Sequence, residues 1–343
     1  MPAIRGRGED IRMFIVANVA RYSADIVRRT AEKFGCTRQA VHRHIKRLVE
    51  EGALVEAGKT RSRTYALAQL SAWNHTYDVA ASGDEGDVWL LDVRQQLEPL
   101  ASNVLDIWQY GFTEIFNNAL DHAEAQRISV SVTKTAASSV VAICDDGVGI
   151  FRKIQAALGL LDERHAVLEL AKGKFTTDPQ RHSGEGIFFS SRMFDQFSIN
   201  SGSVWFSHQA KAPEDWILEI DESGGTSVRM ELGNHTSRSI NKVFKQFTTG
   251  DDFGFTKTVV PVRLAQYGDD NLVSRSQAKR LIVRFDKFRT VVLDFKGVAL
   301  IGQAFADEVF RVFAAAHPEV ELLPLNAGKD VSSMIAHVLE ATP

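Results

Sequence analysis

The stretch Glu114–His122, E-I-F-N-N-A-L-D-H, constrains the fold more than any other part of this sequence. Apolar side chains recur at helical spacing from Trp108 to Leu120, which predicts a helix with one buried face. Glu114 and Asn118 are four residues apart, so a helix places them on the same side. Together they could bind Mg²⁺ through the amide oxygen and orient a water for attack on a phosphoryl group. The same pattern also fits an ordinary amphipathic helix with a polar edge.

Two glycine-containing stretches follow this predicted helix. Val140–Ile150, V-V-A-I-C-D-D-G-V-G-I, is an apolar run that ends in two aspartates and Gly-x-Gly. This pattern predicts a buried strand that opens into a tight turn. In His182–Ser191, H-S-G-E-G-I-F-F-S-S, two glycines precede a predicted helix, whose first N–H groups can meet phosphate. Either Gly-x-Gly alone is typical of an ordinary turn.

In the order E-x-x-x-N-A, D-x-G-x-G and G-x-G, these motifs resemble those of the GHKL ATPases, the Bergerat-fold family of gyrases, heat-shock chaperones, mismatch-repair proteins and sensor kinases. The resemblance covers roughly residues 86–233. It implies an α/β sandwich of helices over a mixed sheet, which binds ATP and Mg²⁺. The second glycine box departs from the commoner G-x-G-L-G-L form, because Ile187, Phe188 and Phe189 follow Gly186.

The resemblance also implies a role for individual residues. Glu114 resembles the general base, Asn118 the Mg²⁺ ligand, and Asp145 the carboxylate that accepts a hydrogen bond from the adenine amino group. Residues 151–183 would form the lid over ATP, although polar loops of this kind are also common without a ligand. The other residues expected at the nucleotide are Asp121, His122, Gly147, Gly149, Lys172, Lys174, Thr176, Thr177, Ser183, Gly184 and Gly186.

Positive charge is concentrated at the N-terminal end of the chain. Residues 1–70 hold 14 Lys and Arg against 7 Asp and Glu, whereas the remainder holds 26 against 36. A basic end on an acidic body favours a polyanion as the partner of that end. The two cysteines, Cys36 and Cys144, lack metal-ligand spacing, and no run resembles a membrane span or a signal peptide. We therefore expect a reduced, cytoplasmic protein that does not bind membranes.

Residues 1–70 carry three helical patterns, over Asp10–Ala20, from a cap at Ser23 to Phe34, and after a cap at Thr37. A two-stranded pattern with Gly58 at its tip follows. This arrangement resembles a winged helix-turn-helix, which implies DNA binding by the third helix and the wing, although such domains can also bind proteins. The residues expected to face DNA are Arg38, Gln39, His42, Arg43, Lys46, Lys59, Arg61 and Arg63.

Between this unit and the ATPase-like region, residues 71–86 lose periodicity, which predicts a linker, with or without a short helix at Trp73–Tyr77. Residues 87–233 form the predicted ATP-binding domain, which begins with a helix over Asp87–Leu97. Its predicted strands are Arg127–Lys134, Ser138–Cys144, Phe197–Asn200, Val204–Gln209, Trp216–Ile220 and Thr226–Leu232, with turns at Pro213 and at Ser223-Gly224-Gly225.

Residues 234–343 alternate strands and helices, which predicts a small α/β domain. Its stretch V-V-L-D-F-K-G-V-A-L-I-G-Q-A-F resembles the STAS-like domains found behind some bacterial GHKL modules. In anti-sigma-antagonist relatives, a serine that opens the following helix is phosphorylated. Gly302-Gln303-Ala304 supplies no hydroxyl there, so we expect a docking or dimerisation surface for a second copy or a partner protein. Lys257–Ala265, broken at Pro261, is expected at the sheet edge, and Ser274 is expected to cap a helix that runs to Phe288.

The sequence thus predicts a multidomain α+β regulator that binds Mg–ATP, hydrolyses it and couples nucleotide state to DNA binding and transcription control. Two alternatives stay open. The chain could be a serine/threonine protein kinase of the anti-sigma-factor type that acts on a partner protein, or an ATP-gated scaffold without turnover. No His-Glu phosphoacceptor helix precedes the Glu114 helix, which disfavours a sensor histidine kinase.

Overall fold

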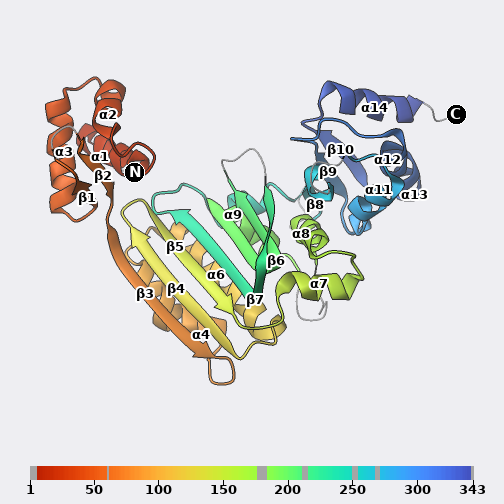
Figure 1. Cartoon of the computed structure of the whole chain (residues 1–343), viewed down its shortest axis with the longest axis horizontal. Helices are drawn as coiled ribbons and strands as arrows, with labels where there is room; N and C mark the ends of the chain where they lie inside the picture. Colours follow the sequence, from red (N-terminus) through yellow and green to blue (C-terminus); the bar gives the residue numbers. More distant parts are fainter. Residues whose placement is uncertain are drawn as a thin grey trace.

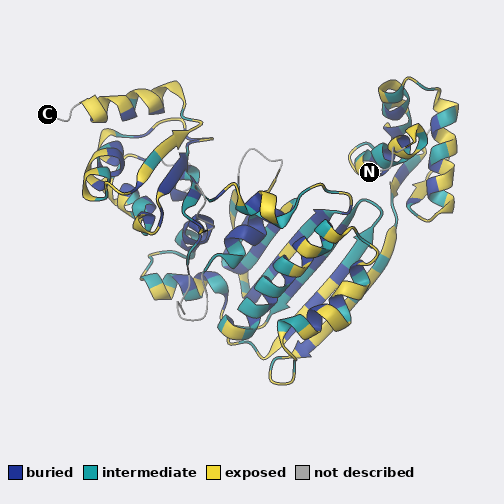
Figure 2. Cartoon of the chain, turned by 180° about the vertical axis from the view of Figure 1, so that it is seen from behind, coloured by how far each residue is buried: buried dark blue, intermediate teal, exposed yellow. Residues whose placement is uncertain are grey.

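The computed structural model describes residues 6–59, 62–175, 184–210, 215–248, 254–266 and 271–340. An N-terminal helical unit and a C-terminal α/β unit lie at opposite ends of a central five-stranded sheet (Figure 1). Helices cover one face of this sheet (Figure 2). The fold is therefore multidomain and combines helices with sheets, as the sequence predicted. Among the described residues, no helix is both long and apolar enough to cross a membrane.

The N-terminal unit has its own hydrophobic core, around Ile15, Val41 and Ile45. Its elements are α1 (Arg7–Asn18), α2 (Ile26–Phe34), α3 (Arg38–Glu50) and the antiparallel pair β1 (Leu54–Ala57) and β2 (Thr64–Leu67). This order of three helices and a hairpin is the one that the sequence predicted.

The two predicted helix caps of this unit have different outcomes. The Thr37 side chain accepts a hydrogen bond from the Ala40 N–H at 3.2 Å, which confirms the cap of α3. The predicted cap at Ser23 is wrong, because Asp25 precedes α2. The Ser23 carbonyl instead accepts from the Tyr65 N–H, which ties the α1–α2 connection to β2.

The linker predicted over residues 71–86 is wrong in its first half. Residues Gln69–Asp78 form β3, the edge strand of the central sheet, with no helix at Trp73–Tyr77. Polar residues alternate with Trp73, His75 and Tyr77 along β3, and of these three only Tyr77 is buried, so the strand lacks the apolar run that marks a buried strand. Only Ala68 separates β2 from β3, so the N-terminal unit continues directly into the sheet.

The central sheet has the strand order β3-β4-β5-β7-β6. Its further strands are β4 (Arg127–Thr135), β5 (Ser138–Asp145), β6 (Gln196–Gln209) and β7 (Trp216–Gly233). Every pairing among the described strands of this sheet is antiparallel, so the mixed sheet predicted from the family resemblance is wrong. The last four predicted strands merge into β6 and β7, because a bulge at Ser201–Val204 bends the ladder without ending it. The predicted turn at Ser223-Gly224-Gly225 lies within β7, and Pro213 lies outside the described residues.

One face of the sheet is covered mainly by α6 (Ser102–His122), whose Trp108, Phe112 and Phe116 are fully buried. The predicted helix before it is confirmed as one continuous helical stretch with a π-helical middle: α4 (Glu85–Val88), η2 (Trp89–Val93) and α5 (Arg94–Leu97). The remaining helices of the central unit are α7 (Ile150–Leu158), α8 (Glu163–Lys172) and α9 (Gly186–Met193). A lid over all of residues 151–183 is therefore wrong for α7 and α8, because both bury apolar faces against the sheet and its neighbours.

The C-terminal unit is a three-stranded parallel sheet of order β10-β9-β8 with helices around it. Its elements are α10 (Ile240–Phe244), β8 (Lys257–Pro261), η3 (Val262–Ala265), α11 (Arg275–Ile282), η4 (Phe285–Lys287), β9 (Thr290–Asp294), α12 (Gln303–Ala306), η5 (Asp307–Phe313), α13 (Ala314–Ala316), β10 (Glu321–Leu325) and α14 (Lys329–Glu340). The predicted edge position of β8 and the Ser274 cap are confirmed, although α11 ends at Ile282 rather than Phe288.

Phenylalanine rings join the C-terminal unit to the central one. Phe188 and Phe189 of α9 pack against Phe247 and Phe255, with ring centroids 4.7–5.9 Å apart. Phe255 in turn contacts Phe288 at 5.3 Å. The two units therefore share one continuous hydrophobic core, and α8 and α9 lie between the sheets.

Candidate functional site

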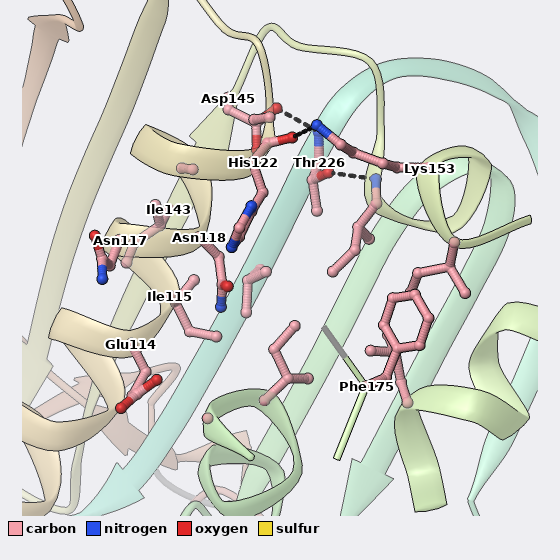
Figure 3. A pocket seen from close by; sticks show the side chains of 18 of the residues that line it. Glu114, Ile115, Asn117, Asn118, His122, Ile143, Asp145, Lys153, Phe175 and Thr226 are labelled. Atoms are coloured by element: carbon pink, nitrogen blue, oxygen red, sulfur yellow. Dashed lines mark hydrogen bonds between the residues drawn. The ribbon is translucent and has the colours of Figure 1, made fainter. Parts of the chain in front are cut away.

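A cavity of about 330 Å³ opens between α6, α7, α8, α9, the end of β5 and the middle of β7. Figure 3 shows the side chains that line it. Polar groups converge on it from α6 and β5, while Leu170, Ile187 and Val228 make apolar walls. An apolar cavity with a few convergent polar groups is the usual form of a small-molecule site.

The side of α6 that faces the cavity carries Glu114, Asn118 and His122, each one turn from the next, together with Asn117 (Figure 3). A helix rises 1.5 Å per residue, so Glu114 and His122 are about 12 Å apart along the axis. The cavity is therefore long enough for a nucleotide that runs along α6. Asp121 is exposed on the solvent side of α6 and does not line the cavity, so the structure does not bring it together with the other predicted ligand residues.

Asp145 lies at the end of the cavity away from Glu114 (Figure 3), and backbone N–H groups hold its carboxylate there. Its Oδ1 accepts hydrogen bonds from the N–H groups of Gly147, at 3.0 Å, and Thr226, at 3.1 Å. Burial raises the pKa of the Asp145 carboxyl, and these two N–H groups oppose that shift. Oδ2 accepts no hydrogen bond from any described residue, and Asp145 lines the cavity. This oxygen can therefore accept from an amino group of a ligand.

Three of the four predicted glycines line the cavity, namely Gly149, Gly184 and Gly186. Gly186 begins α9, and a Cβ there would lie 1.9 Å from Oε2 of Glu114. Only glycine lets the Glu114 carboxylate approach the helix N-terminus so closely. Gly147, in contrast, does not line the cavity. It packs on the end of α6, where a Cβ would lie 2.0 Å from the Ala123 carbonyl oxygen.

Neither predicted lid lysine points into the cavity, so phosphate contact is wrong for both. Lys172 is fully buried, and its Nζ lies 2.6 Å from Glu169 Oε1 and 3.0 Å from the Val283 carbonyl oxygen. Lys174 Nζ donates to the Lys287 carbonyl at 2.9 Å. Both lysines face the C-terminal unit, which covers α8. Thr176, Thr177 and Ser183 lie outside the described residues.

Three polar residues at the cavity, Asn117, Lys153 and Thr226, escaped the sequence analysis. Thr226 donates its N–H to Asp145, and its hydroxyl accepts from the Ile150 N–H at 3.0 Å. No local signal marks this role, because Thr226 meets Asp145 only through the pairing of β5 with β7. Lys153 donates to the His122 carbonyl at 2.5 Å and to Glu124 at 2.9 Å. Lys153 lies one turn after Gly149 on α7, a helix that the sequence analysis did not predict.

The residues predicted to face DNA are exposed where the structure describes them. Arg38, Gln39, His42, Arg43 and Lys46 lie along the open side of α3. Lys59 and Arg63 flank the tip of the β1–β2 hairpin and are also exposed, whereas Arg61 lies outside the described residues. Lys46 and Arg63 each approach a glutamate, Glu50 and Glu56, at 3.6 Å.

The donor set at the cavity fits Mg²⁺ bound largely by a ligand. No group of three or more His, Cys, Asp or Glu that could hold a metal occurs in the part of the chain that the structure describes. Mg²⁺ commonly takes one or two protein oxygens and completes its shell with water and substrate phosphates. The Asn118 amide oxygen at the cavity meets that requirement.

Comparison with protein families agrees with this geometry. Residues 89–205 match the family described as a histidine kinase-like ATPase domain, and residues 277–332 match a STAS-like domain of unknown function. The chain therefore contains a histidine-kinase-like ATPase domain followed by a STAS-like domain. The first match includes Glu114, Asn118, Asp145, Gly184 and Gly186. A comparison with curated proteins gave no match.

Proposed function

We propose that this protein is an ATP-dependent regulator, which binds and hydrolyses Mg–ATP in the cavity and thereby changes DNA binding by its N-terminal unit. The observation that carries this proposal is the convergence of Glu114, Asn118, Asp145 and the glycines of two separate loops on one cavity. These residues come from three segments of the chain, 114–118, 145–149 and 184–186, and each segment supplies a group that nucleotide chemistry requires.

In the proposed reaction, Asp145 accepts from the adenine amino group, and the N–H groups at the start of α9 face the phosphates. Asn118 would hold Mg²⁺, which neutralises phosphate charge when bound. Glu114 lies against the N-terminus of α9, about 12 Å along α6 from His122, at the end of the cavity where adenine would bind. Its carboxylate can therefore orient a water at the terminal phosphate and take its proton.

Contacts across the interface support a coupling between the cavity and the STAS-like domain. Arg284 donates to Glu169 Oε2 at 3.1 Å and to the Gly173 carbonyl at 2.7 Å. Its guanidinium also lies 5.3 Å from the ring centre of Phe175, which lines the cavity. A nucleotide that moves Phe175 would therefore also move Arg284.

A second set of contacts supports a coupling to the N-terminal unit. Strand β5 ends at Asp145 in the cavity, and the β4–β5 turn at its other end packs Ala136 and Ala137 on the core of the N-terminal unit. Because β2 continues into β3 through Ala68 alone, no flexible linker would absorb a shift of the sheet. DNA binding could thus respond to the state of the cavity.

The STAS-like domain supports a second candidate function, a protein kinase of the anti-sigma-factor type. The start of α12 carries Gly302, Gln303 and Ala304, which have no hydroxyl, so the acceptor would be another protein. A homodimer or partner contact through this domain is also proposed, since β10 is an edge strand with Leu323 and Leu325 exposed. Incubation with γ-labelled ATP tests the proposals: we expect free phosphate, whereas labelled protein would indicate the kinase and neither product a scaffold.

Asp145→Asn should weaken ATP binding and reverse the preference for ATP over GTP. The asparagine carbonyl can keep the two backbone hydrogen bonds, while its amide presents a donor to the cavity. An unmade buried hydrogen bond costs about 1–3 kcal/mol, so ATP affinity should fall by about 5- to 150-fold. Calorimetry with both nucleotides measures the change. Asp146→Asn is the matched control, since Asp146 binds Arg127 outside the cavity. Equal affinity of the wild type for ATP and GTP would contradict the role of Asp145.

DNA binding should reside in residues 1–70 and weaken steeply with salt. If α3 and the hairpin neutralise four to six phosphates, log K should fall with log salt at a slope of roughly −4 to −5. Replacing Lys59, Arg61 and Arg63 with glutamine should reduce that slope by about 2 to 3. Fluorescence anisotropy at several salt concentrations gives the slope, with Arg311→Gln in η5 as a distant control. DNA binding that does not depend on salt concentration, or no binding to any DNA, would favour a protein-binding role for this unit.

A further inference from the structure

A second cavity of about 330 Å³ lies between the ATPase domain and the STAS-like domain, away from the first. Arg192 of α9, His208 of β6 and Asp215 line it on one side. On the other side, Pro261, Asp294 and Asn326 stand at the carboxyl ends of β8, β9 and β10. The carboxyl ends of parallel strands are where open α/β sheets usually bind ligands.

Within the described residues, the side-chain contacts of the Arg192 guanidinium at this cavity are with His208 and, at longer range, with Asp215. Its Nη1 lies 2.8 Å from Nδ1 of His208, and the same Nδ1 lies 2.5 Å from Asp215 Oδ1. Burial lowers the pKa of His208, so its ring is neutral at pH 7, and one nitrogen cannot both donate to Asp215 and accept from Arg192. The carboxylate can only accept, so the Nδ1 proton points to Asp215. The other His208 nitrogen is 3.4 Å from Nη1, the outer limit of a hydrogen bond.

On Asp215, by contrast, one carboxylate oxygen needs a hydrogen-bond donor. Its side chain is 7% exposed, and Oδ2 is buried without a hydrogen bond from any described residue. The Arg192 Nη1 is 3.9 Å from this oxygen, too far to donate. A buried carboxylate oxygen without a hydrogen-bond donor is unfavourable, because it has lost its water and gained no partner. The site therefore combines a cation that can donate to a ligand with an anion that needs a donor.

The rest of the cavity adds positive charge. Arg263 and Lys296 line it, and Lys296 Nζ makes no ion pair within the described ranges. Asp294 is already engaged, because its Oδ1 accepts from the Lys296 N–H at 3.0 Å and from Asn326 Nδ2 at 2.8 Å. Arg192 and Lys296 thus offer donors to an anion, while Asp215 Oδ2 needs a donor, which favours an anionic ligand that also carries a hydroxyl group.

We propose that this cavity binds inorganic phosphate in its hydrogen phosphate form. Arg192 and Lys296 donate to the anionic oxygens, and the P–OH group donates to Asp215 Oδ2. Inorganic phosphate keeps a proton throughout the neutral range. Sulfate has none, and a phosphate monoester loses its last proton with a pKa of about 6, so both would set an anionic oxygen against Asp215. The site therefore selects free phosphate, and it lies where a ligand would contact both domains.

Calorimetry on the full, nucleotide-free chain at pH 8 and constant ionic strength tests this proposal. We expect phosphate to bind, and sulfate and glycerol phosphate to bind at least about tenfold more weakly, since a hydrogen bond to a charged group contributes about 1.5–3 kcal/mol. Asp215→Asn should remove the discrimination against sulfate, because an amide can donate to it. Lys296 is exposed, so Lys296→Gln should weaken phosphate binding about tenfold without a folding penalty. Arg229→Gln, on the outer face of β7, is the control and should bind like the wild type.

Several outcomes would overturn the proposal. These are no phosphate binding by the wild type, equal binding of sulfate and phosphate, or wild-type affinity in Lys296→Gln. Phosphate bound in the first cavity would be displaced by ATP and unaffected by either variant, and that result also contradicts the site. If Asp215→Asn loses its near-UV circular dichroism signal, this variant has not folded. The Lys296→Gln variant and the comparison of phosphate with sulfate on the wild type then test the phosphate site.

Discussion

Glu114→Ala should keep Mg–ATP affinity near that of the wild type while phosphate release falls by about 10²–10⁴-fold, the usual contribution of a positioned general base. The Glu114 carboxylate lies against the N-terminus of α9, whereas the proposed groups for Mg²⁺ and adenine are those of Asn118 and Asp145. Removing Glu114 should therefore affect the attacking water more than the bound nucleotide. Calorimetry measures the affinity, and a continuous phosphate assay measures release.

Asp121→Ala is the matched control for this variant. Asp121 is on the same helix but exposed and outside the cavity, so both quantities should remain unchanged. Unchanged phosphate release in Glu114→Ala would show that Glu114 is not the base. DNA binding by Glu114→Ala gives a further readout: it should match the wild type with a non-hydrolysable analogue if ATP binding is the signal. If hydrolysis drives the output, the variant should instead resemble the nucleotide-free protein.

The second large effect concerns stability, and we expect Lys172→Ala to destabilise the chain by about 3 kcal/mol or more. Lys172 is fully buried between the two domains, beside Glu169, whose side chain is 3% exposed. Its removal leaves Glu169 Oε1 and the Val283 carbonyl without their donor. Arg284 still pairs with Glu169 Oε2, which keeps the loss at the lower end of the range for broken buried pairs.

Urea unfolding, followed by fluorescence and circular dichroism, measures this loss. The chain is multidomain, so the first transition is the one to compare. Lys174→Ala is the control: Lys174 is partly exposed, and its contact with Phe288, 4.9 Å from the ring centre, is expected to contribute only about 0.5–1 kcal/mol. The double variant Glu169→Gln/Lys172→Met removes both charges and should recover part of the loss. Equal midpoints for Lys172→Ala and the wild type would show that the buried pair does not hold the domains together.

Local periodicity accounts for the part of the site that could be predicted. Glu114, Asn118 and His122 were placed on one side of a helix because the 3.6-residue period depends only on neighbouring residues. The strand before Asp145 and the helix after Gly186 were likewise predicted, since an apolar run and a glycine turn are local signals. Strand β3 was missed for the opposite reason: an edge strand with alternating polar residues lacks such a run, and its partners in β4 are 49 to 66 residues away.

The sequence by itself determined the order of the three motifs, the polar side of α6, the cap of α3 and the alternation of strand and helix after residue 234. Each depends on residues within a turn or two of one another. Only the tertiary structure decided that Thr226 anchors Asp145, because the register of β5 on β7 joins residues 81 positions apart. It also decided that Lys172 is buried against Val283 rather than directed at a phosphate. A lysine near a glycine-rich loop has the same local pattern in either role, and the domain that packs over it determines which one it takes.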